Sequence, residues 1–177
     1  MDTADPQSRP LLVIGYGNTL REDDGVGPRV AGLVEEFGLP GVEVLACPQL
    51  SPEHAEAVAG ARTVIFVDAA MGSVGPVRLR RLAPAGSARV STHLASPGTL
   101  LALARQVYGR APNAWMLALP ACRMGYGDEL SFTAQRGMDA AVRIIRRFAR
   151  LEQLRLSGPS LGAGSNPFVP EFAESDR

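Results

Sequence analysis

The chain has 177 residues, with 18 basic and 18 acidic side chains and a formal net charge of zero at pH 7. This length suggests one domain, the balanced charge disfavours a nucleic-acid-binding protein, and no apolar stretch approaches the roughly 18 residues that a membrane span needs. Cys47 and Cys122 form neither a disulfide framework nor a CxxC metal motif, and no signal peptide is visible at the polar N-terminus. We therefore expect a cytoplasmic protein with reduced thiols.

Apolar runs alternate with helical patterns along the chain, which indicates parallel strands joined by helices. In chain order we expect a strand at 11–14, a helix at 26–37, a strand at 42–46, a short helix at 52–59, strands at 64–67 and 77–82, a helix at 97–108, a strand at 114–119 and a long helix at 133–154. This order predicts an α/β fold, a three-layer α/β/α domain with a doubly wound, mostly parallel sheet of about five strands.

Several of these elements carry local signals of their position. The strand at 64–67 is wholly apolar, as a strand covered on both faces should be, whereas 77–82 alternates apolar and basic residues and suits a sheet edge. Ser51 and Ser96 are predicted N-caps of the two helices that follow them. We expect residues 1–9 to be a flexible arm, 10–156 a single domain, and 157–177, rich in Gly, Pro and Ser, a disordered tail.

Two adjacent carboxylates, Asp23 and Asp24, follow the first strand on a predicted loop flanked by glycines. Ligand crevices in open α/β sheets lie outside the carboxyl ends of the strands. Gly15 and Gly17 should permit a tight loop beneath the carboxylates, and the side chain of Asn18 should hold that loop by bonding local backbone groups. The glycine spacing matches only half of a dinucleotide fingerprint, so no organic cofactor is expected.

Asp68 ends the strand at 64–67, and His93 precedes the helix at 97–108, so both should face the same crevice as Asp24. Taken singly, Asp68 could cap a turn and a lone loop histidine is more often structural. Together, two carboxylates and an imidazole suit a borderline divalent metal and leave positions open for water and substrate. Such a metal could polarise a carbonyl and lower the pKa of a bound water toward ~7, which would permit amide cleavage.

The other potential ligands are expected to be structural. His54 lies in a short polar helix beside two glutamates and is predicted to be a solvated surface residue. Cys47 and Cys122 are predicted to be small buried hydrophobic residues.

Three motifs occur together in this chain: Gly-x-Gly-Asn-x-Leu-x-x-Asp-Asp-Gly-x-Gly at 15–27, a strand ending in Val67-Asp68-Ala69, and Ser-Thr-His at 91–93 before a leucine-rich helix. Over about residues 11–150 the chain resembles the hydrogenase maturation proteases, endopeptidases that trim the C-terminus of the nickel-containing hydrogenase large subunit. The resemblance implies a doubly wound, phosphorylase/hydrolase-like α/β/α fold. It also implies that the protein substrate is a large-subunit precursor, with no nucleic-acid or membrane partner.

By motif position, the resemblance implies that Asp24, Asp68 and His93 are the catalytic residues and also the side chains that reach the metal. That metal is nickel already inserted in the precursor, so it arrives with the substrate. Asp24 stands where relatives often carry Glu, and Asp23 is an alternative ligand or a partner of the ligands. Three residues are further expected to contact the substrate: Gln49, Asp23 and Asn18.

Other functions remain open from the sequence. A metal-free aspartic-type hydrolase could use Asp23 or Asp24 with Asp68, because paired carboxylates can share a proton and activate water. A nickel-checking chaperone could bind the same precursor with the same ligands and leave it uncut. An RNA-end hydrolase is disfavoured by the zero net charge.

Overall fold

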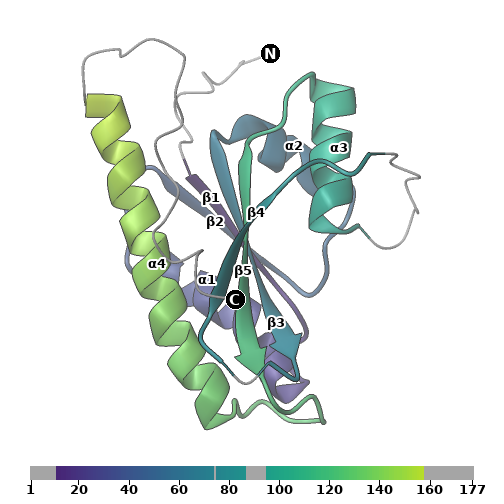
Figure 1. Cartoon of the computed structure of the whole chain (residues 1–177), viewed down its shortest axis with the longest axis vertical. Coiled ribbons are helices and arrows are strands. Elements are labelled where there is room, and N and C mark those ends of the chain that lie inside the picture. The colour runs from purple at the N-terminus through teal and green to yellow at the C-terminus, as the bar shows by residue number, and fades with distance from the viewer. Residues whose placement is uncertain (1–10, 74, 87–94, 158–177) are drawn as a thin grey trace, which may run out of the picture.

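The computed structural model describes residues 11–73, 75–86 and 95–157. Over these residues a five-stranded sheet lies between two layers of helices (Figure 1). The strands are β1 (Leu11–Tyr16), β2 (Val42–Cys47), β3 (Thr63–Met71), β4 (Arg78–Leu82) and β5 (Asn113–Ala121). The helices are the 3-10 turn η1 (Glu22–Gly25), then α1 (Val26–Glu36), α2 (His54–Gly60), α3 (Pro97–Tyr108) and α4 (Phe132–Ser157).

The strand order is β2-β1-β3-β5-β4. Strands β1, β2, β3 and β5 are parallel, and β4 pairs antiparallel with β5 at one edge. The predicted fold class and the predicted edge strand are therefore confirmed. The four parallel strands end at one common edge of the sheet, which is where a ligand site is expected in this architecture.

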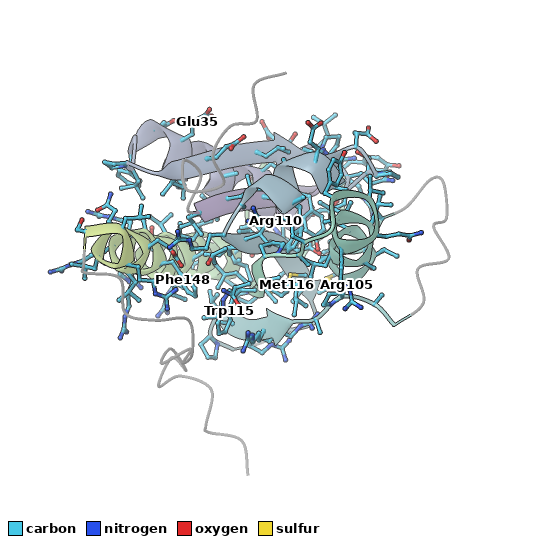
Figure 2. All side chains as sticks on the ribbon, turned by 90° about the horizontal axis from the view of Figure 1, so that it is seen from above. Glu35, Arg105, Arg110, Trp115, Met116 and Phe148 are labelled. Carbon is cyan, nitrogen blue, oxygen red and sulfur yellow. The ribbon has the colours of Figure 1, made fainter. Side chains whose placement is uncertain are left out.

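The sheet separates two apolar clusters. Helices α1 and α4 cover one face and α2 and α3 cover the other (Figure 1). Figure 2 shows the alternation on β5, where Trp115 lies toward Phe148 of α4 and its neighbour Met116 lies toward α3. The rings of Trp115 and Phe148 meet edge to face with centroids 5.6 Å apart. The central strands β1 and β3 are apolar because helices cover both of their faces.

The two predicted helix caps had different outcomes. Ser96 caps α3 as predicted: its Oγ accepts the Thr99 N–H at 3.2 Å, and the Thr99 Oγ1 accepts the Ser96 N–H at 2.7 Å. The prediction for α2 was wrong, because this helix begins at His54 with Glu53 as N-cap and no side-chain cap. Ser51 instead donates its N–H to Nδ1 of His54 at 3.0 Å. His54 is therefore half-buried and hydrogen-bonded, and the predicted solvated position was also wrong.

Three further expectations need correction. Asp23 and Asp24 lie in the turn η1 rather than in a loop, and β3 continues past Asp68 to Met71. Cys122 is exposed, whereas Cys47 is half-buried against the cluster beneath α2 and α3. The predicted arm at 1–9 and all of the predicted tail except Ser157 lie outside the described residues. None of the helices in the described part of the chain is long and apolar enough to span a bilayer.

Candidate active site

The turn after β1 fixes the first candidate carboxylate. Gly17 has φ +137°, and a Cβ there would lie 2.0 Å from the carbonyl oxygen of Asp24, so only glycine fits. The Asn18 N–H donates to Oδ2 of Asp24 at 3.0 Å, and the Asn18 Oδ1 accepts the Leu20 N–H at 2.9 Å. The predicted local role of Asn18 is confirmed. Asp24, which is half-buried, is thereby held at the carboxyl end of β1.

Two glycines allow the same turn to pack closely against the sheet. A Cβ at Gly15 would lie 2.1 Å from the carbonyl oxygen of Gly27, and a Cβ at Gly27 would lie 2.4 Å from the Tyr16 oxygen and 2.6 Å from the Val67 oxygen. The first turn of α1 therefore contacts the ends of β1 and β3 without an intervening side chain. Gly15 permits this close approach because it lacks a Cβ, and only Gly17 of the two predicted glycines has a positive φ.

Asp68 occupies the same edge on the neighbouring strand. Its Oδ1 accepts the Ala69 N–H at 2.8 Å, and the phenol of Tyr16 is hydrogen-bonded to its carboxylate. Burial raises the pKa of Asp68, these two hydrogen bonds oppose the rise, and the negative charge of Asp24 adds to it. The structure thus brings Asp24 and Asp68 within electrostatic reach of each other.

Tyr16 is the site residue that the sequence analysis missed. Gly15 pairs with Val67, so Tyr16 comes level with Asp68 on the adjacent strand. Burial, and then the Asp68 carboxylate, raise the pKa of Tyr16, so the phenol stays protonated and donates to Asp68. The only sequence feature that could have indicated Tyr16 is its position, as the last residue of a buried strand and between two glycines. It could not be interpreted without the pairing of β1 with β3.

Asp23 differs from its neighbour Asp24 in burial and in hydrogen-bond partners. It is 0% exposed, and its Oδ2 accepts the N–H groups of Cys122 at 2.8 Å and Arg123 at 2.9 Å and the Ser131 hydroxyl at 2.8 Å. Its Oδ1 accepts the Ser131 N–H at 2.7 Å. Both oxygens are occupied by the segment between β5 and α4. Asp23 therefore has a structural position, which leaves no accessible oxygen for the substrate contact or metal bond that the sequence suggested.

Further bonds join the turn η1 to that segment. The Glu22 N–H donates to the Gly127 carbonyl at 2.8 Å, the Gly127 N–H donates to the Leu20 carbonyl at 3.0 Å, and Glu22 Oε2 accepts the Gly125 N–H at 2.8 Å. The Nε of Arg123 lies 3.6 Å from Oε1 of Glu22. The segment from 122 to 131 consequently fixes the backbone that carries Asp24.

Two predicted site residues, His93 and Gln49, remain to be placed. His93 lies outside the described residues, so its approach to Asp24 and Asp68 stays a prediction. Within the described ranges no group of three or more His, Cys, Asp or Glu side chains is placed to hold a metal. Gln49 is exposed in the segment after β2. The described part of the site thus consists of Asp24, Asp68 and Tyr16.

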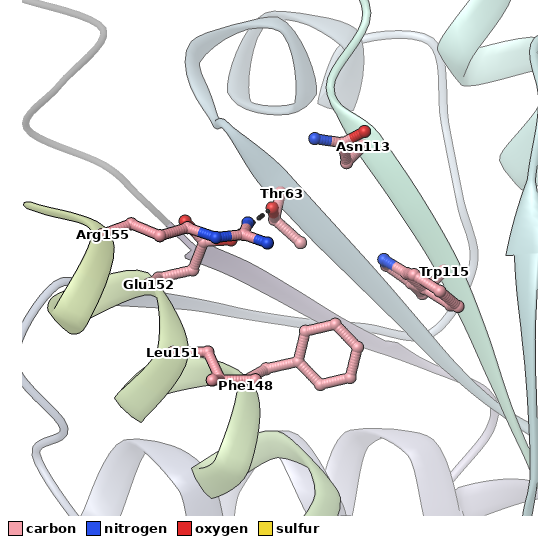
Figure 3. A pocket seen from close by; sticks show the side chains of 7 residues that line it. All are labelled: Thr63, Asn113, Trp115, Phe148, Leu151, Glu152 and Arg155. Carbon is pink, nitrogen blue, oxygen red and sulfur yellow. Dashed lines mark hydrogen bonds and ion pairs between the residues drawn. The ribbon is translucent and has the colours of Figure 1, made fainter. Parts of the chain in front are cut away.

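A cavity between β3, β5 and α4 is separate from this site. Figure 3 shows it lined by Thr63 and Asn113, the first residues of β3 and β5, and by Glu152 of α4. The Thr63 hydroxyl donates to Glu152 Oε1 at 2.9 Å. The cavity therefore lies at the amino ends of the strands, opposite to Asp24 and Asp68.

No protein-family model and no curated protein matches the chain. Solved structures do match it. The [NiFe] hydrogenase maturation protease HycI from Thermococcus kodakarensis aligns at 22% identity and TM-score 0.62, over 80% of this chain and 93% of that one. The hydrogenase maturating endopeptidase HybD from E. coli aligns at 22% identity and TM-score 0.62, over 84% and 94%.

A third structure, the hydrogenase 2 maturation peptidase from a Thaumarchaeota archaeon, aligns at 26% identity and TM-score 0.58, over 80% of this chain and 99% of that one. The chain thus has the fold of the hydrogenase maturation proteases and spans nearly all of each of these three. The resemblance drawn from the motifs is confirmed at the level of the fold.

Proposed function

We propose that this chain is a hydrogenase maturation endopeptidase, which removes a C-terminal extension from the large-subunit precursor of a [NiFe] hydrogenase. The observation that carries the proposal is the juxtaposition of Asp24 and Asp68 at the carboxyl edge of a sheet that has the fold of these proteases. Two carboxylates within electrostatic reach of each other, one of them bonded to a phenol, are suited to hydrolytic chemistry. The motif resemblance and the fold likeness support the same assignment.

We further propose that Asp24, Asp68 and His93 bind the nickel ion that the precursor carries. Carboxylate oxygens and an imidazole nitrogen suit a borderline divalent ion. Three protein ligands would hold free nickel loosely, so the ion is supplied by the substrate and no organic cofactor takes part. Cleavage would then depend on correct loading of the precursor. Tyr16, which donates to Asp68, orients that carboxylate.

An aspartyl-type reaction without nickel and a nickel-checking chaperone are the competing functions. The test mixes the purified protein with nickel-loaded and nickel-free precursor and follows the intact mass of the precursor. Our proposal predicts that only the loaded form loses a C-terminal peptide. Equal cleavage of both forms would favour a metal-free aspartic mechanism, and binding without any loss of mass would favour the chaperone.

Substitutions identify the site in the same assay. Asp24→Asn, Asp68→Asn and His93→Ala should each abolish processing while the protein stays folded. Glu35→Gln is the matched control, because Glu35 is exposed near the C-terminal end of α1 (Figure 2), whereas Asp24 lies in the turn before the start of that helix. If all three site variants process the precursor at the normal rate, the site is misassigned.

We also propose that the protein works in the cytoplasm. Cys47 and Cys122 are both free thiols, which suits a reducing compartment. The predicted absence of nucleic-acid and membrane partners remains part of this proposal.

A further inference from the structure

Two arginines of the edge strand lie beside the candidate site. Phe66 and Leu82 pack on the cluster beneath α2 and α3, whereas Leu79 packs on the opposite cluster. Because side chains alternate along a strand, Arg78 and Arg80 lie on the same face of the sheet as Asp68. Asp68 pairs with Ala118, and Ala118 pairs with Arg78. Arg78 is therefore two strands from Asp68, about 10 Å away.

Among the described residues, none pairs with either guanidinium group. Arg78 and Arg80 are exposed, and within the described ranges neither side chain makes a hydrogen bond or an ion pair. The positive charge of Arg80 nevertheless reaches the site, since it opposes the rise in the pKa of Tyr16 that burial and Asp68 cause. By contrast, Arg81 lies on the other face and donates to Asn113 Oδ1 at 3.2 Å.

The backbone of β4 pairs on only one side with other described strands. Within the described part of the chain β4 is the last strand of the sheet, paired only with β5. The unpaired groups of an edge strand can bind an extended peptide as an additional strand. Arg78 and Arg80 are two residues apart, a spacing of about 6.8 Å, which equals the spacing of alternate side chains on such a peptide.

We propose that Arg78 and Arg80 form a carboxylate-binding subsite on β4 for an extended segment of the precursor that carries acidic side chains at alternate positions. The segment adds to the edge of β4, and each arginine pairs with one carboxylate. The subsite rests on the proposed function and deepens it, because it holds the substrate chain about three residues from the two candidate catalytic acids. Arg78 and Arg80 are thus positioning residues for the substrate.

The test measures the rate of processing against the concentration of nickel-loaded precursor. The double variant Arg78→Gln/Arg80→Gln should raise KM about fivefold and leave kcat within about twofold, because two exposed ion pairs are lost. The rise should shrink toward 1 M salt, where screening acts over about 3 Å. Arg81→Gln, on the same strand but the opposite face, is the control and should leave KM unchanged. An unchanged KM in the double variant overturns the subsite.

A second experiment changes the substrate and identifies which carboxylates of the precursor bind the arginines. Changing the acidic side chains of the precursor extension to amides should raise KM with the unsubstituted protein and should add nothing with the double variant. If amidation of the precursor C-terminus alone reproduces the whole effect, the arginines bind the terminal carboxylate and the proposed strand addition is wrong.

Binding without turnover separates this inference from the function on which it rests. Equilibrium binding of the precursor is compared between Asp68→Asn and the same variant with both arginines replaced. A fivefold weaker complex after the arginine changes supports the subsite even if the unsubstituted protein cuts nothing, in which case only the endopeptidase assignment fails. Equal binding, together with normal cleavage by the unsubstituted protein, rejects the subsite alone.

Discussion

The structural role of Asp23 makes the sharpest prediction about stability. Its carboxylate accepts three backbone N–H groups and one hydroxyl at 2.7–2.9 Å, all from the segment between β5 and α4. Asp23→Ala would leave these buried donors without an acceptor, at about 1–3 kcal/mol for each group. Because relaxation and water recover part of that cost, we expect a net loss of about 3–5 kcal/mol. This is a large fraction of the roughly 5–15 kcal/mol that stabilises a typical domain.

Asp23→Asn should cost less than Asp23→Ala and still be clearly destabilising. One amide oxygen can replace Oδ2, but the amide NH2 then faces the Ser131 N–H, which is also a donor. We expect about 1–3 kcal/mol of lost stability. Urea unfolding followed by circular dichroism measures both variants, and a 3 kcal/mol loss at a slope of roughly 1–3 kcal/mol/M lowers the midpoint by about 1 M or more. Asp139→Asn, on the exposed side of α4, is the isosteric control.

The pH dependence tests the same carboxylate. Burial would raise the pKa of Asp23, but the hydrogen bonds from Ser131, Cys122 and Arg123 outweigh burial and hold the pKa below its usual value. Since the folded pKa lies below the unfolded one, the stabilisation is present above about pH 4 and is lost as the pH falls through the folded pKa. The difference in unfolding free energy between the native sequence and Asp23→Asn should therefore narrow in acid. A urea unfolding midpoint for Asp23→Ala equal to that of the unsubstituted protein would refute this structural role of Asp23.

Two further predictions concern the edge of the sheet. Gly27→Ala should lower the free energy of unfolding by about 3 kcal/mol, because its Cβ would meet the Tyr16 and Val67 carbonyls at 2.4 and 2.6 Å. Gly32→Ala on the same helix meets open space and should stabilise by about 0.5–1 kcal/mol, so equal urea midpoints for the two variants would contradict this packing. Tyr16→Phe removes the donor that orients Asp68 and should slow precursor cleavage about tenfold, the equivalent of ~1.4 kcal/mol. A rate equal to that of the unsubstituted protein would show that the phenol has no such role.

Much of the fold could be predicted from local pattern. The continuous apolar runs of β1 and β3 indicate strands covered on both faces, and the alternating arginines of β4 indicate an edge. The cap of α3 was also predictable, because Ser96 and Thr99 satisfy each other within one helical turn. These features depend on residues close together in the chain, so they can be predicted without knowledge of the tertiary contacts.

The candidate site was only partly predictable. Strand-end positions correctly placed Asp24 and Asp68 at one edge, but Tyr16 needed the register of β1 against β3. Ser51 failed as a cap because α2 begins only at His54, and the Ser51 Oγ lies 3.2 Å from His54 Nδ1 and caps no backbone N–H of the helix. Competition between local partners of similar strength is decided by the packing around them.

The sequence by itself determined that strands and helices alternate, that the sheet is mostly parallel, and that acidic residues lie near the carboxyl ends of its central strands. Only the tertiary structure decided which of the two adjacent aspartates has a structural position and which belongs to the candidate site. Asp23 and Asp24 are chemically identical, yet Asp23 is bound by Ser131, 108 positions away, whereas Asp24 stays beside Asp68. A side chain's role depends on the hydrogen-bond donors and charges that surround it in space, and folding brings those from distant parts of the chain.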